Sequence, residues 1–306
     1  MPSETNMNRR ELLRNTTALT AAALLPETLY GSTQQKATPD IYDGPGSNQH
    51  PSAVHLPSQS PVRLGIASYT FRKFDDAHLI DFMKQLKTPW LNLKDSHLKM
   101  GSPEQVAAEA AQYRAAGFTL TAAGNITFDK DTDEDIRPKF EYLKAAGIPI
   151  AVCAPTHQNL PRLEKFVKEY NIKLAIHNHG PEDKNFPSPL DVLAAVKNLD
   201  PRIGCCIDIG HTMRAGTDVP TAIKAAGPRL FDLHMKDLAD ATSKESQVAV
   251  GQGIMPIRAI FQTLTDIRYT GNADLEYEIV PDNPMPGVVE SFAYMRGVLA
   301  GMGFKG

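Results

Sequence analysis

The chain has 306 residues and a formal net charge of −3, with 42% hydrophobic and 22% charged residues. Such a composition is typical of a globular protein with a sizeable core, and the length suits one large domain of the size of an α/β barrel. The slight excess of acidic over basic residues excludes a strongly basic surface for binding nucleic acid. No apolar run is long enough to span a bilayer.

The N-terminus has the layout of an export signal. Residues 8–14 read NRRELLR, which resembles the twin-arginine pattern, and a modestly apolar stretch follows from Asn15 to Leu25. A basic segment ahead of a short apolar one is typical of a signal peptide, although a short amphipathic helix is the alternative. We therefore expect a twin-arginine signal peptide over residues 1–37 and a periplasmic or exported protein.

Residues 38–61 are expected to form a flexible linker, because they are rich in Gly, Pro, Ser, Gln and Asn and show no hydrophobic period. The catalytic domain is expected to span residues 62–306. There, strand-like and helix-like segments alternate. The expected strands are Leu64–Phe71, Trp90–His97, Thr119–Ile126, Ile148–Pro155, Ile172–Gly180, Ile203–Ile209, Leu230–Asp237 and Asp274–Ile279. The expected helices are Asp76–Lys87, Pro103–Ala116, Asp133–Ala146, Leu160–Tyr170, Pro189–Asn198, Val219–Ala226, Pro256–Asp266 and Gly287–Leu299.

This alternation predicts an α/β fold with parallel strands and helical crossovers. Eight units are the number that closes a (β/α)8 TIM barrel. The alternative is an open doubly wound sheet that binds a nucleotide. It would need a Gly-rich phosphate-binding turn after the first strand, and residues 65–68 do not supply one.

The three cysteines, Cys153, Cys205 and Cys206, lie in apolar strand-like runs. Nothing in their spacing resembles a disulfide framework or a CxxC zinc site. We therefore expect buried free thiols, which behave as small apolar side chains.

Polar residues gather at the carboxyl ends of the expected strands, where a barrel builds its active site. Residues two apart in a strand point to the same side, so inward-facing positions follow from alternation. In the seventh strand, for example, Phe231 is expected to face the helices. Six of the nine histidines fall at these strand ends: His97, His157, His177, His179, His211 and His234. The inward-facing residues are expected to be His177, His179, Cys206, Asp208, Asp232, His234, Lys236, Glu276 and Glu278.

Four neighbouring strands would thus deliver His, Asp, His and Glu side chains to one place. Buried carboxylates and imidazoles need partners, and a divalent cation satisfies several of them at once. Mixed His and carboxylate ligands suit Mn, Zn, Fe or Co. The alternative is a hydrogen-bonded barrel interior without a metal.

Four segments resemble the sugar phosphate isomerase/epimerase family, whose members are xylose-isomerase-like TIM barrels related to the AP-endonuclease barrel. They are Asp208–His211 (DIGH), Leu233–Asp237 (LHMKD), Gly251–Gly253 (GQG) and Gly271 followed by Glu276. The resemblance extends from Leu64 to about Gly301.

The resemblance implies one divalent metal ion, with Mn as the first choice and Zn, Co, Fe or Mg as alternatives. Carried over by position, the ligands would be His177, Asp208, His234 and Glu276. Whether Glu276 or Glu278 is the ligand stays open. The resemblance also implies that His211 hydrogen-bonds a substrate hydroxyl.

The sequence departs from the family at His177, where many epimerases have a Glu that works with the eighth-strand Glu as a pair of bases. An imidazole can replace a carboxylate as a ligand. It leaves the site less negative and removes one of the two acid/base groups. Simple epimerisation by two opposed glutamates is therefore in doubt.

From this set of residues we predict a metal-dependent sugar isomerase or epimerase. It would abstract a proton next to a carbonyl through a metal-stabilised enediolate. The candidate bases are Glu278, His179 and Lys236, in that order, although Glu278 could instead orient a ligand. The further candidate substrate contacts at the rim are Lys94, His97 and His157.

An exported enzyme would meet an unphosphorylated sugar or keto-sugar rather than a sugar phosphate. Two other functions stay open. A 3-keto-glycoside lyase would remove the proton at C2 and expel the group at C1 by β-elimination, which needs only one strong base. A non-catalytic sugar-binding barrel would bind its sugar without a metal. The oligomeric state, including a homo-oligomer, is open as well.

Overall fold

The computed structural model describes residues 58–305, so the predicted signal peptide and most of the predicted linker lie outside the described residues. The last residues assigned to the linker do have regular structure. Strand β1, Ser58–Gln59, pairs in parallel with strand β12, Phe304–Lys305. This pairing joins the two ends of the described chain beside the barrel.

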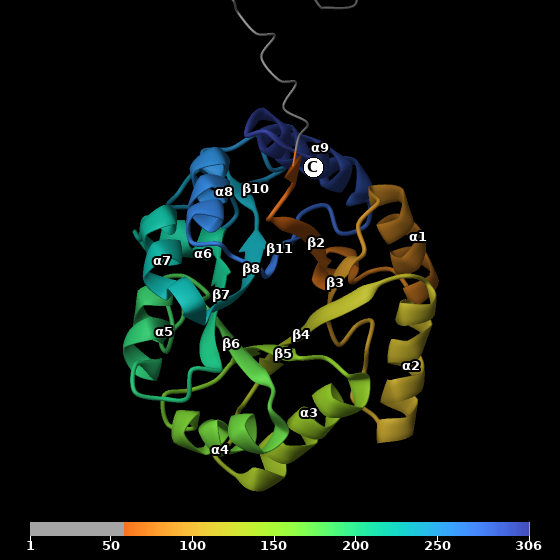
Figure 1. Cartoon of the computed structure of the whole chain (residues 1–306), viewed down its shortest axis with the longest axis vertical. Coiled ribbons are helices and arrows are strands. Elements are labelled where there is room, and N and C mark those ends of the chain that lie inside the picture. The colour runs from red at the N-terminus through yellow and green to blue at the C-terminus, as the bar shows by residue number, and fades with distance from the viewer. Residues whose placement is uncertain (1–57, 306) are drawn as a thin grey trace, which may run out of the picture. The chain divides into compact units, whose positions relative to one another are not determined.

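Eight parallel strands form a closed barrel in the order β11-β2-β3-β4-β5-β6-β7-β8. Figure 1 looks into this barrel and shows the helices outside the ring of strands. The predicted (β/α)8 fold is therefore confirmed. The barrel strands are β2 Arg63–Ala67, β3 Trp90–Leu93, β4 Thr119–Thr127, β5 Ile150–Ala154, β6 Lys173–His177, β7 Ile203–Asp208, β8 Leu230–Met235 and β11 Asn272–Leu275.

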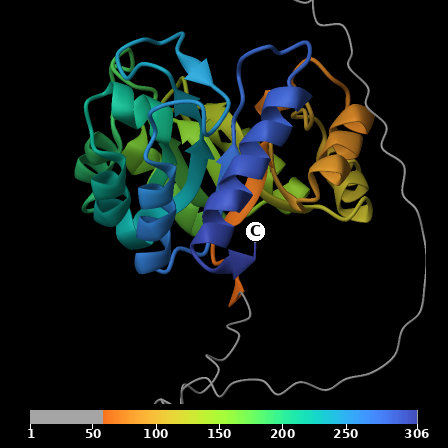
Figure 2. The same cartoon turned by 90° about the horizontal axis from the view of Figure 1, so that it is seen from above.

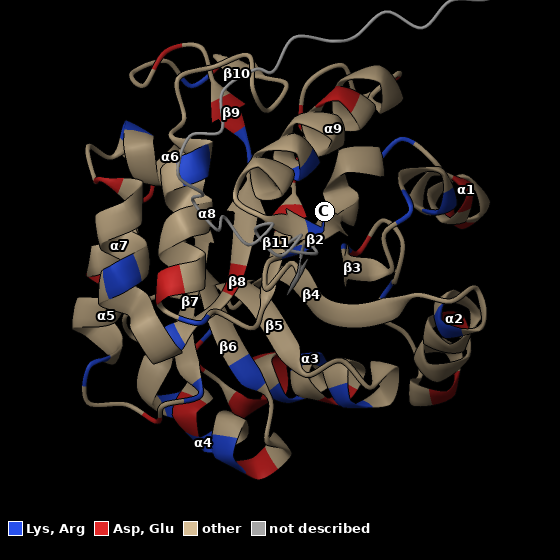
Figure 3. Ribbon diagram, turned by 45° about the horizontal axis from the view of Figure 1, so that its top comes forward, with Lys and Arg blue, Asp and Glu red and all other residues tan. Residues whose placement is uncertain are grey.

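The helices lie close to their predicted positions, and within residues 58–305 none is long and apolar enough to cross a membrane. In the view of Figure 3, acidic and basic residues are mixed along the outer helices α3 and α4. The helices are α1 Asp76–Leu86, α2 Pro103–Ala115, α3 Asp133–Ala146, α4 Leu160–Tyr170, α5 Pro189–Val196, α6 Ile209–Arg214, α7 Val219–Ala226, α8 Ile257–Asp266 and α9 Met285–Gly301, with short 3-10 turns η1 Ser68–Phe71 and η2 Gly227–Arg229.

Helix α6 is an element that the sequence pattern did not indicate. It starts directly where β7 ends, and Asp208 is its N-cap residue, accepting a hydrogen bond from the His211 backbone N–H at 2.8 Å. An aspartate is among the preferred N-cap residues because its carboxylate accepts from the first free N–H groups. The cap holds one carboxylate oxygen of Asp208 and leaves the other facing the barrel.

Several strands are shorter than predicted at their carboxyl ends. The backbone of β3 stops at Leu93, after which the N–H groups of His97 and Leu98 both bond to the Lys94 carbonyl and form a turn. A second short pair, β9 Asp237–Leu238 and β10 Gln247–Val248, follows β8. Figure 2 shows it at the opposite end of the barrel from β1 and β12. These irregular segments surround the carboxyl ends of the strands.

The expected orientation of Phe231 is wrong. Cys205 pairs with Leu230 and Cys206 pairs with Asp232, so Phe231 is the extra residue where the register shifts. An unpaired extra residue of this kind re-aims side chains. Phe231 accordingly packs with Ala122, Val152, Ala175 and Cys206 rather than with the large core cluster of the helices.

The three cysteines are buried free thiols, as predicted. Burial raises the pKa of the Cys205 thiol to about 12 and that of the Cys206 thiol well above its usual value. Their side chains diverge, because Cys206 packs in the inner cluster and Cys205 in the outer core. Neither thiol is exposed to bulky thiol reagents in the folded barrel.

We predict that the native protein does not react with a thiol-specific chromogenic reagent at pH 8, because the thiolate is the nucleophile and burial keeps these thiols protonated. In guanidinium chloride all three cysteines should react, since unfolding returns their pKa to the ordinary range. An exposed cysteine introduced by Lys99→Cys serves as the positive control. Rapid labelling of the native wild-type chain would contradict the buried placement.

Candidate functional site

Four side chains from neighbouring strands converge at the carboxyl end of the barrel. His177 ends β6, Asp208 ends β7, His234 lies in β8, and Glu276 follows β11 directly. One nitrogen or oxygen atom of each lies within 4.8 Å of the corresponding atoms of the others. The structure thus brings together all four residues that the resemblance implied as ligands.

The contacts inside this metal-ligand cluster are close. His177 Nε2 lies 3.0 Å from His234 Nδ1 and 3.6 Å from Asp208 Oδ2, and His234 Nδ1 lies 3.1 Å from Glu276 Oε2. Asp208 Oδ2 is buried and makes no aligned hydrogen bond with any described residue. Divalent metals bind such nitrogen and oxygen atoms at about 2.0–2.2 Å. The cluster therefore could hold one metal ion, with Asp208 Oδ2 as one of its oxygen ligands.

Lys236 balances the carboxylates of the cluster. Its ammonium lies 2.8 Å from Asp208 Oδ2, 3.0 Å from Glu276 Oε2 and 2.6 Å from Glu278 Oε2. Burial alone would lower the pKa of Lys236, but these three carboxylates outweigh burial and hold it well above its usual value. Lys236 is therefore a permanent cation at neutral pH.

The same competition between burial and neighbouring charges sets the protonation of His234, Glu276 and His177. Burial opposes a charge on His234, but Glu276, Asp232 and Asp208 raise its pKa to about 9. The pKa of Glu276 is held well below its usual value by His234 and Lys236, against the effect of burial. For His177, burial comes first and His234 adds to it, so its pKa falls well below the usual value. His177 is accordingly neutral, whereas His234 would have to lose its proton to bind a metal, because a ligating imidazole is neutral.

A second layer orients the ligands. Behind His234, Asn92 Nδ2 donates to Asp232 Oδ2 at 2.7 Å, and this oxygen lies 3.9 Å from His234 Nε2. A carboxylate behind a ligating imidazole fixes its orientation and leaves the other nitrogen for the metal. On β7, Asn178 accepts from the Asp208 backbone N–H at 3.0 Å and fixes the end of the strand.

A cavity of about 480 Å³ adjoins the cluster. Lys236 belongs to both, since it lines the cavity and contacts two of the four clustered side chains. The volume falls in the range of small-molecule sites. Its polar wall includes His179, His211, Arg214, Lys236, Gln247 and Glu278.

Glu278, the first of the predicted bases, is held in position through its backbone. Glu278 lines the cavity, and its main chain is held by two contacts: its N–H donates to Gln247 Oε1 at 3.0 Å, and its carbonyl accepts from Arg72 at 2.7 Å. Gln247 also donates to the Glu276 carbonyl at 2.7 Å. Strand β11 ends at Leu275, but the Glu276 N–H still donates to the Met235 carbonyl of β8 at 3.0 Å, and the contacts from Gln247 and Arg72 hold the segment through Glu278 in the cavity wall.

The two cavity histidines have opposite partners. Arg214 Nη1 lies 3.1 Å from His211 Nδ1, and a guanidinium can only donate, so the neutral His211 ring carries its hydrogen on Nε2. Arg214 is itself held by Glu182. His179 Nδ1 lies 3.3 Å from Asp183 Oδ2, while its Nε2 lies 2.9 Å from the Asn125 amide nitrogen.

Three predicted substrate contacts do not line this cavity. His97 is 2% exposed, and its ring nitrogens lie 3.2 Å from Ser68 Oγ and 3.1 Å from the Phe74 carbonyl. His157 is exposed and packs on Phe186. Lys94 donates to the Asn125 carbonyl at 3.2 Å. The turns after β3 and β5 carry these side chains away from the metal-ligand cluster.

Sequence reasoning missed the partners of the cavity histidines. Arg214 lies three residues after His211 on α6, and a helix brings such positions together. The spacing of this pair therefore predicts their contact. Glu182 and Asp183 lie in the loop after β6 and Asn125 in β4, where no periodic signal points to the site. Only the folded chain places them.

We predict that His177→Ala and Asp208→Ala each lower the affinity for Mn²⁺ by more than about 100-fold, since loss of a ligand should exceed the effect of losing an outer partner. His157→Ala is the control, because it removes an exposed imidazole outside the cluster. Metal content by mass spectrometry and a Mn²⁺ titration followed by electron paramagnetic resonance provide the measurement. A wild-type chain that binds no divalent metal would favour the non-catalytic sugar-binding barrel.

Comparisons with known proteins agree with this architecture. A solved protein from Parabacteroides distasonis shares 23% identity at a TM-score of 0.59, covering 78% of this chain and 99% of that one. A D-psicose 3-epimerase solved in the presence of D-fructose shares 16% identity at a TM-score of 0.62, covering 78% and 99%. The IOLI protein, solved with a zinc atom, shares 16% identity at a TM-score of 0.66, covering 80% and 100%.

At these identities the likeness shows a shared fold. No curated protein matches the chain in sequence. The family described as xylose isomerase-like TIM barrel matches residues 102–298, which is more than half of the chain. The chain therefore belongs to the xylose isomerase-like TIM-barrel family.

Proposed function

We propose that the protein is a metal-dependent sugar isomerase or epimerase that moves a proton on a carbon next to a carbonyl. The observation that carries this proposal is a buried metal-ligand cluster joined through Lys236 to a polar cavity. Two solved proteins of this fold are D-psicose 3-epimerases, one in the presence of D-fructose and one with D-tagatose. A sugar or keto-sugar in the cavity would place its oxygens near the cluster.

We take Mn²⁺ as the resident ion, with Zn²⁺, Co²⁺, Fe²⁺ or Mg²⁺ as alternatives. Two imidazoles and two carboxylates form a mixed donor set that suits Mn, Fe, Co and Zn, and Mg least. When bound, the ion acts as a Lewis acid that polarises the substrate carbonyl and stabilises the charge that develops on its oxygen.

Glu278 is the base in this proposal. Its carboxylate faces the cavity, and contacts from Gln247 and Arg72 fix its backbone. Lys236 is excluded as a base because its raised pKa keeps it protonated. Its ammonium instead stabilises negative charge on the substrate and receives support from Glu278 at 2.6 Å.

The two histidines would bind substrate oxygens and exchange protons. His211 presents Nε2–H as a donor, because Arg214 occupies Nδ1. This matches a hydrogen bond to a substrate hydroxyl. His179 lines the same cavity with Asp183 at Nδ1 and Asn125 at Nε2, so it would accept or return a proton only after releasing the Asn125 amide.

A 3-keto-glycoside lyase is the second candidate, and the observation that favours it is His177 in the cluster. The site then has Glu278 as one cavity carboxylate beside Lys236, and no second glutamate in the position of His177. β-Elimination needs one base to remove the C2 proton while the group at C1 leaves. A probable 3-DHS dehydratase has the same fold, at 13% identity and a TM-score of 0.63.

The decisive experiment is proton exchange in D₂O. We expect the Mn²⁺-loaded protein to exchange the C–H next to the carbonyl of a free ketose, followed by nuclear magnetic resonance. Glu278→Gln should slow this exchange by about 10²–10⁴-fold, because it removes the base. The matched control is Glu245→Gln, which removes another carboxylate that lines the same cavity.

Parallel incubation with a 3-keto-glucoside separates the two reactions. Release of the C1 group with loss of the C2 proton supports the lyase. Exchange on ketoses without elimination supports the isomerase or epimerase. Absence of both, with metal bound, would overturn the enzyme proposal.

We propose further that the enzyme is exported and therefore acts on an unphosphorylated substrate. Replacing the pair Arg9 and Arg10 by lysines should leave the protein in the cytoplasm, because the twin-arginine route reads both. Arg14→Lys lies outside the pair and is the control. Cell fractionation with an immunoblot measures the outcome, and periplasmic accumulation of the double-lysine variant would contradict the signal.

A further inference from the structure

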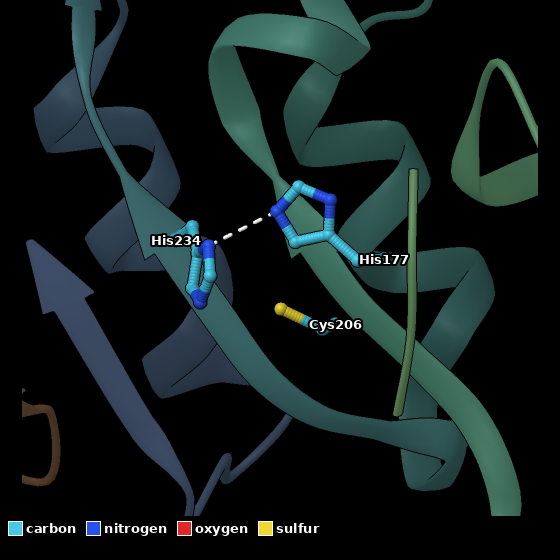
Figure 4. A group of neighbouring side chains, drawn as sticks. All are labelled: His177, Cys206 and His234. Atoms are coloured by element: carbon cyan, nitrogen blue, oxygen red, sulfur yellow. Dashed lines mark hydrogen bonds between the residues drawn. The ribbon is translucent and has the colours of Figure 1, made fainter. Parts of the chain in front are cut away.

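A second group of ligand atoms shares two residues with the metal-ligand cluster. One atom each of His177, Cys206 and His234 lie within 4.8 Å of one another. All three side chains are buried, at 4%, 1% and 3% exposure. Figure 4 shows the Cys206 sulfur pointing toward the space beside the two imidazoles.

Strand register explains why the thiol is there. His177 on β6 is the direct cross-strand partner of Cys206 on β7, and Asp208 is the partner of His234 on β8. Cys206 precedes Asp208 by two residues, so both side chains point to the same side of β7, with Cys206 one layer deeper. His177 is therefore level with the Cys206 thiol and His234 with the Asp208 carboxylate, so the two histidines border both donor sets.

The two donor sets differ in chemical softness. The upper set has two imidazoles and the carboxylates of Asp208 and Glu276, which suits Mn²⁺. The lower set replaces both carboxylates by one sulfur. Thiolate ligands select soft metals, such as Cu⁺, Zn²⁺ and Cd²⁺.

We propose that Cys206, with His177 and His234, forms an alternative site for thiophilic metal ions one layer below the proposed catalytic metal. This inference rests on the proposed function only in that the catalytic metal uses the same two histidines. When the soft ion binds, the Cys206 S–H bond breaks, a metal–sulfur bond forms, and the proton passes to the Asp232 carboxylate, whose Oδ2 lies 3.9 Å from the sulfur. One ion then excludes the other.

The identity of the bound metal ion would then determine whether the site is active. An ion in the upper set adjoins the cavity through Lys236, whereas an ion held by Cys206 lies below Asp208 and farther from the substrate. Thiophilic metals should therefore displace Mn²⁺ and inhibit the reaction. The displacement should be one for one, because both ions need His177 and His234.

The neighbouring residue provides a matched control. Cys205 is as buried as Cys206, at 0% exposure, but its sulfur lies 4.0 Å from the Pro189 carbonyl in the outer core. It is adjacent in sequence and points away from the histidines. Cys205→Ser and Cys206→Ser thus make the same chemical change on opposite faces of β7.

The test is a Cd²⁺ titration followed by the ultraviolet thiolate-to-cadmium charge-transfer band and by release of bound Mn²⁺, detected by electron paramagnetic resonance. The wild type and Cys205→Ser should show the band and release one Mn²⁺ for each Cd²⁺. Cys206→Ser should lose the band and lower Cd²⁺ affinity by at least about tenfold, with Mn²⁺ affinity little changed. Cys206→Ala is the second variant if Cys206→Ser does not fold.

The titration of the wild-type protein alone can support or overturn this inference, without any variant. Mn²⁺ binding without any thiolate band on Cd²⁺ addition would overturn this inference and leave the proposed function intact. A thiolate band in a protein that binds no Mn²⁺ would support the inference and overturn Mn²⁺ as the resident ion. Equal Cd²⁺ affinity in Cys205→Ser and Cys206→Ser would also overturn it.

Discussion

The mutual compensation of buried charges at the carboxyl end of the barrel is the constraint on which the site depends. Asp208, His234 and Lys236 are almost fully buried, and each would be costly to bury alone. Together with Glu276 as the fourth member they neutralise one another through contacts of 2.8–3.1 Å. Removing any one of them leaves another charge without a partner, so the cluster acts as a unit.

The surrounding structure serves to hold this unit in place. Helix α6 begins at Asp208 because that carboxylate caps it, and Asn178 fixes the same strand end from the neighbouring strand. Gln247, on the β9–β10 pair, ties the segment after β11 to the site. The barrel register adds the order along the strands, in which Asp208 is level with His234, and Cys206, two residues earlier, is level with His177. A shift of one residue in β7 would turn Asp208 outward and abolish the cluster.

The chemistry of the site follows from what surrounds it. In the proposed reaction, His177 takes the place of one of two opposed glutamates, so Glu278 in the cavity wall would carry the proton transfer. Three carboxylates hold the pKa of Lys236 well above its usual value, so in this proposal Lys236 stabilises charge and Glu278 abstracts the proton. Arg214 fixes His211 as a hydrogen-bond donor. The proposed enolisation would thus use His211 and Lys236 to donate and stabilise, and Glu278 to accept.

The sequence by itself determined the eight strand–helix units, the closed barrel and the convergence of His177, Asp208, His234 and a glutamate of the eighth unit, because strand alternation and the placement of polar residues at strand ends are local properties. It also predicted that the cysteines are buried free thiols. It misplaced Phe231, since the extra residue between Cys205 and Cys206 pairings is set by the neighbouring strand. It also extended the eighth strand to Glu276 and Glu278, which contacts from β10 and η1 position instead.

Only the tertiary structure decided which carboxylate joins the cluster, which histidines reach the cavity, and which residues contact those histidines. His97 and His157 lie at strand ends like His211, yet turns after β3 and β5 direct them elsewhere. Glu182 and Asp183 come from a loop whose path no periodic pattern encodes. The physical reason is that the strand ends are fixed by local hydrogen bonding, whereas the loops above them are fixed by contacts between residues far apart in the chain.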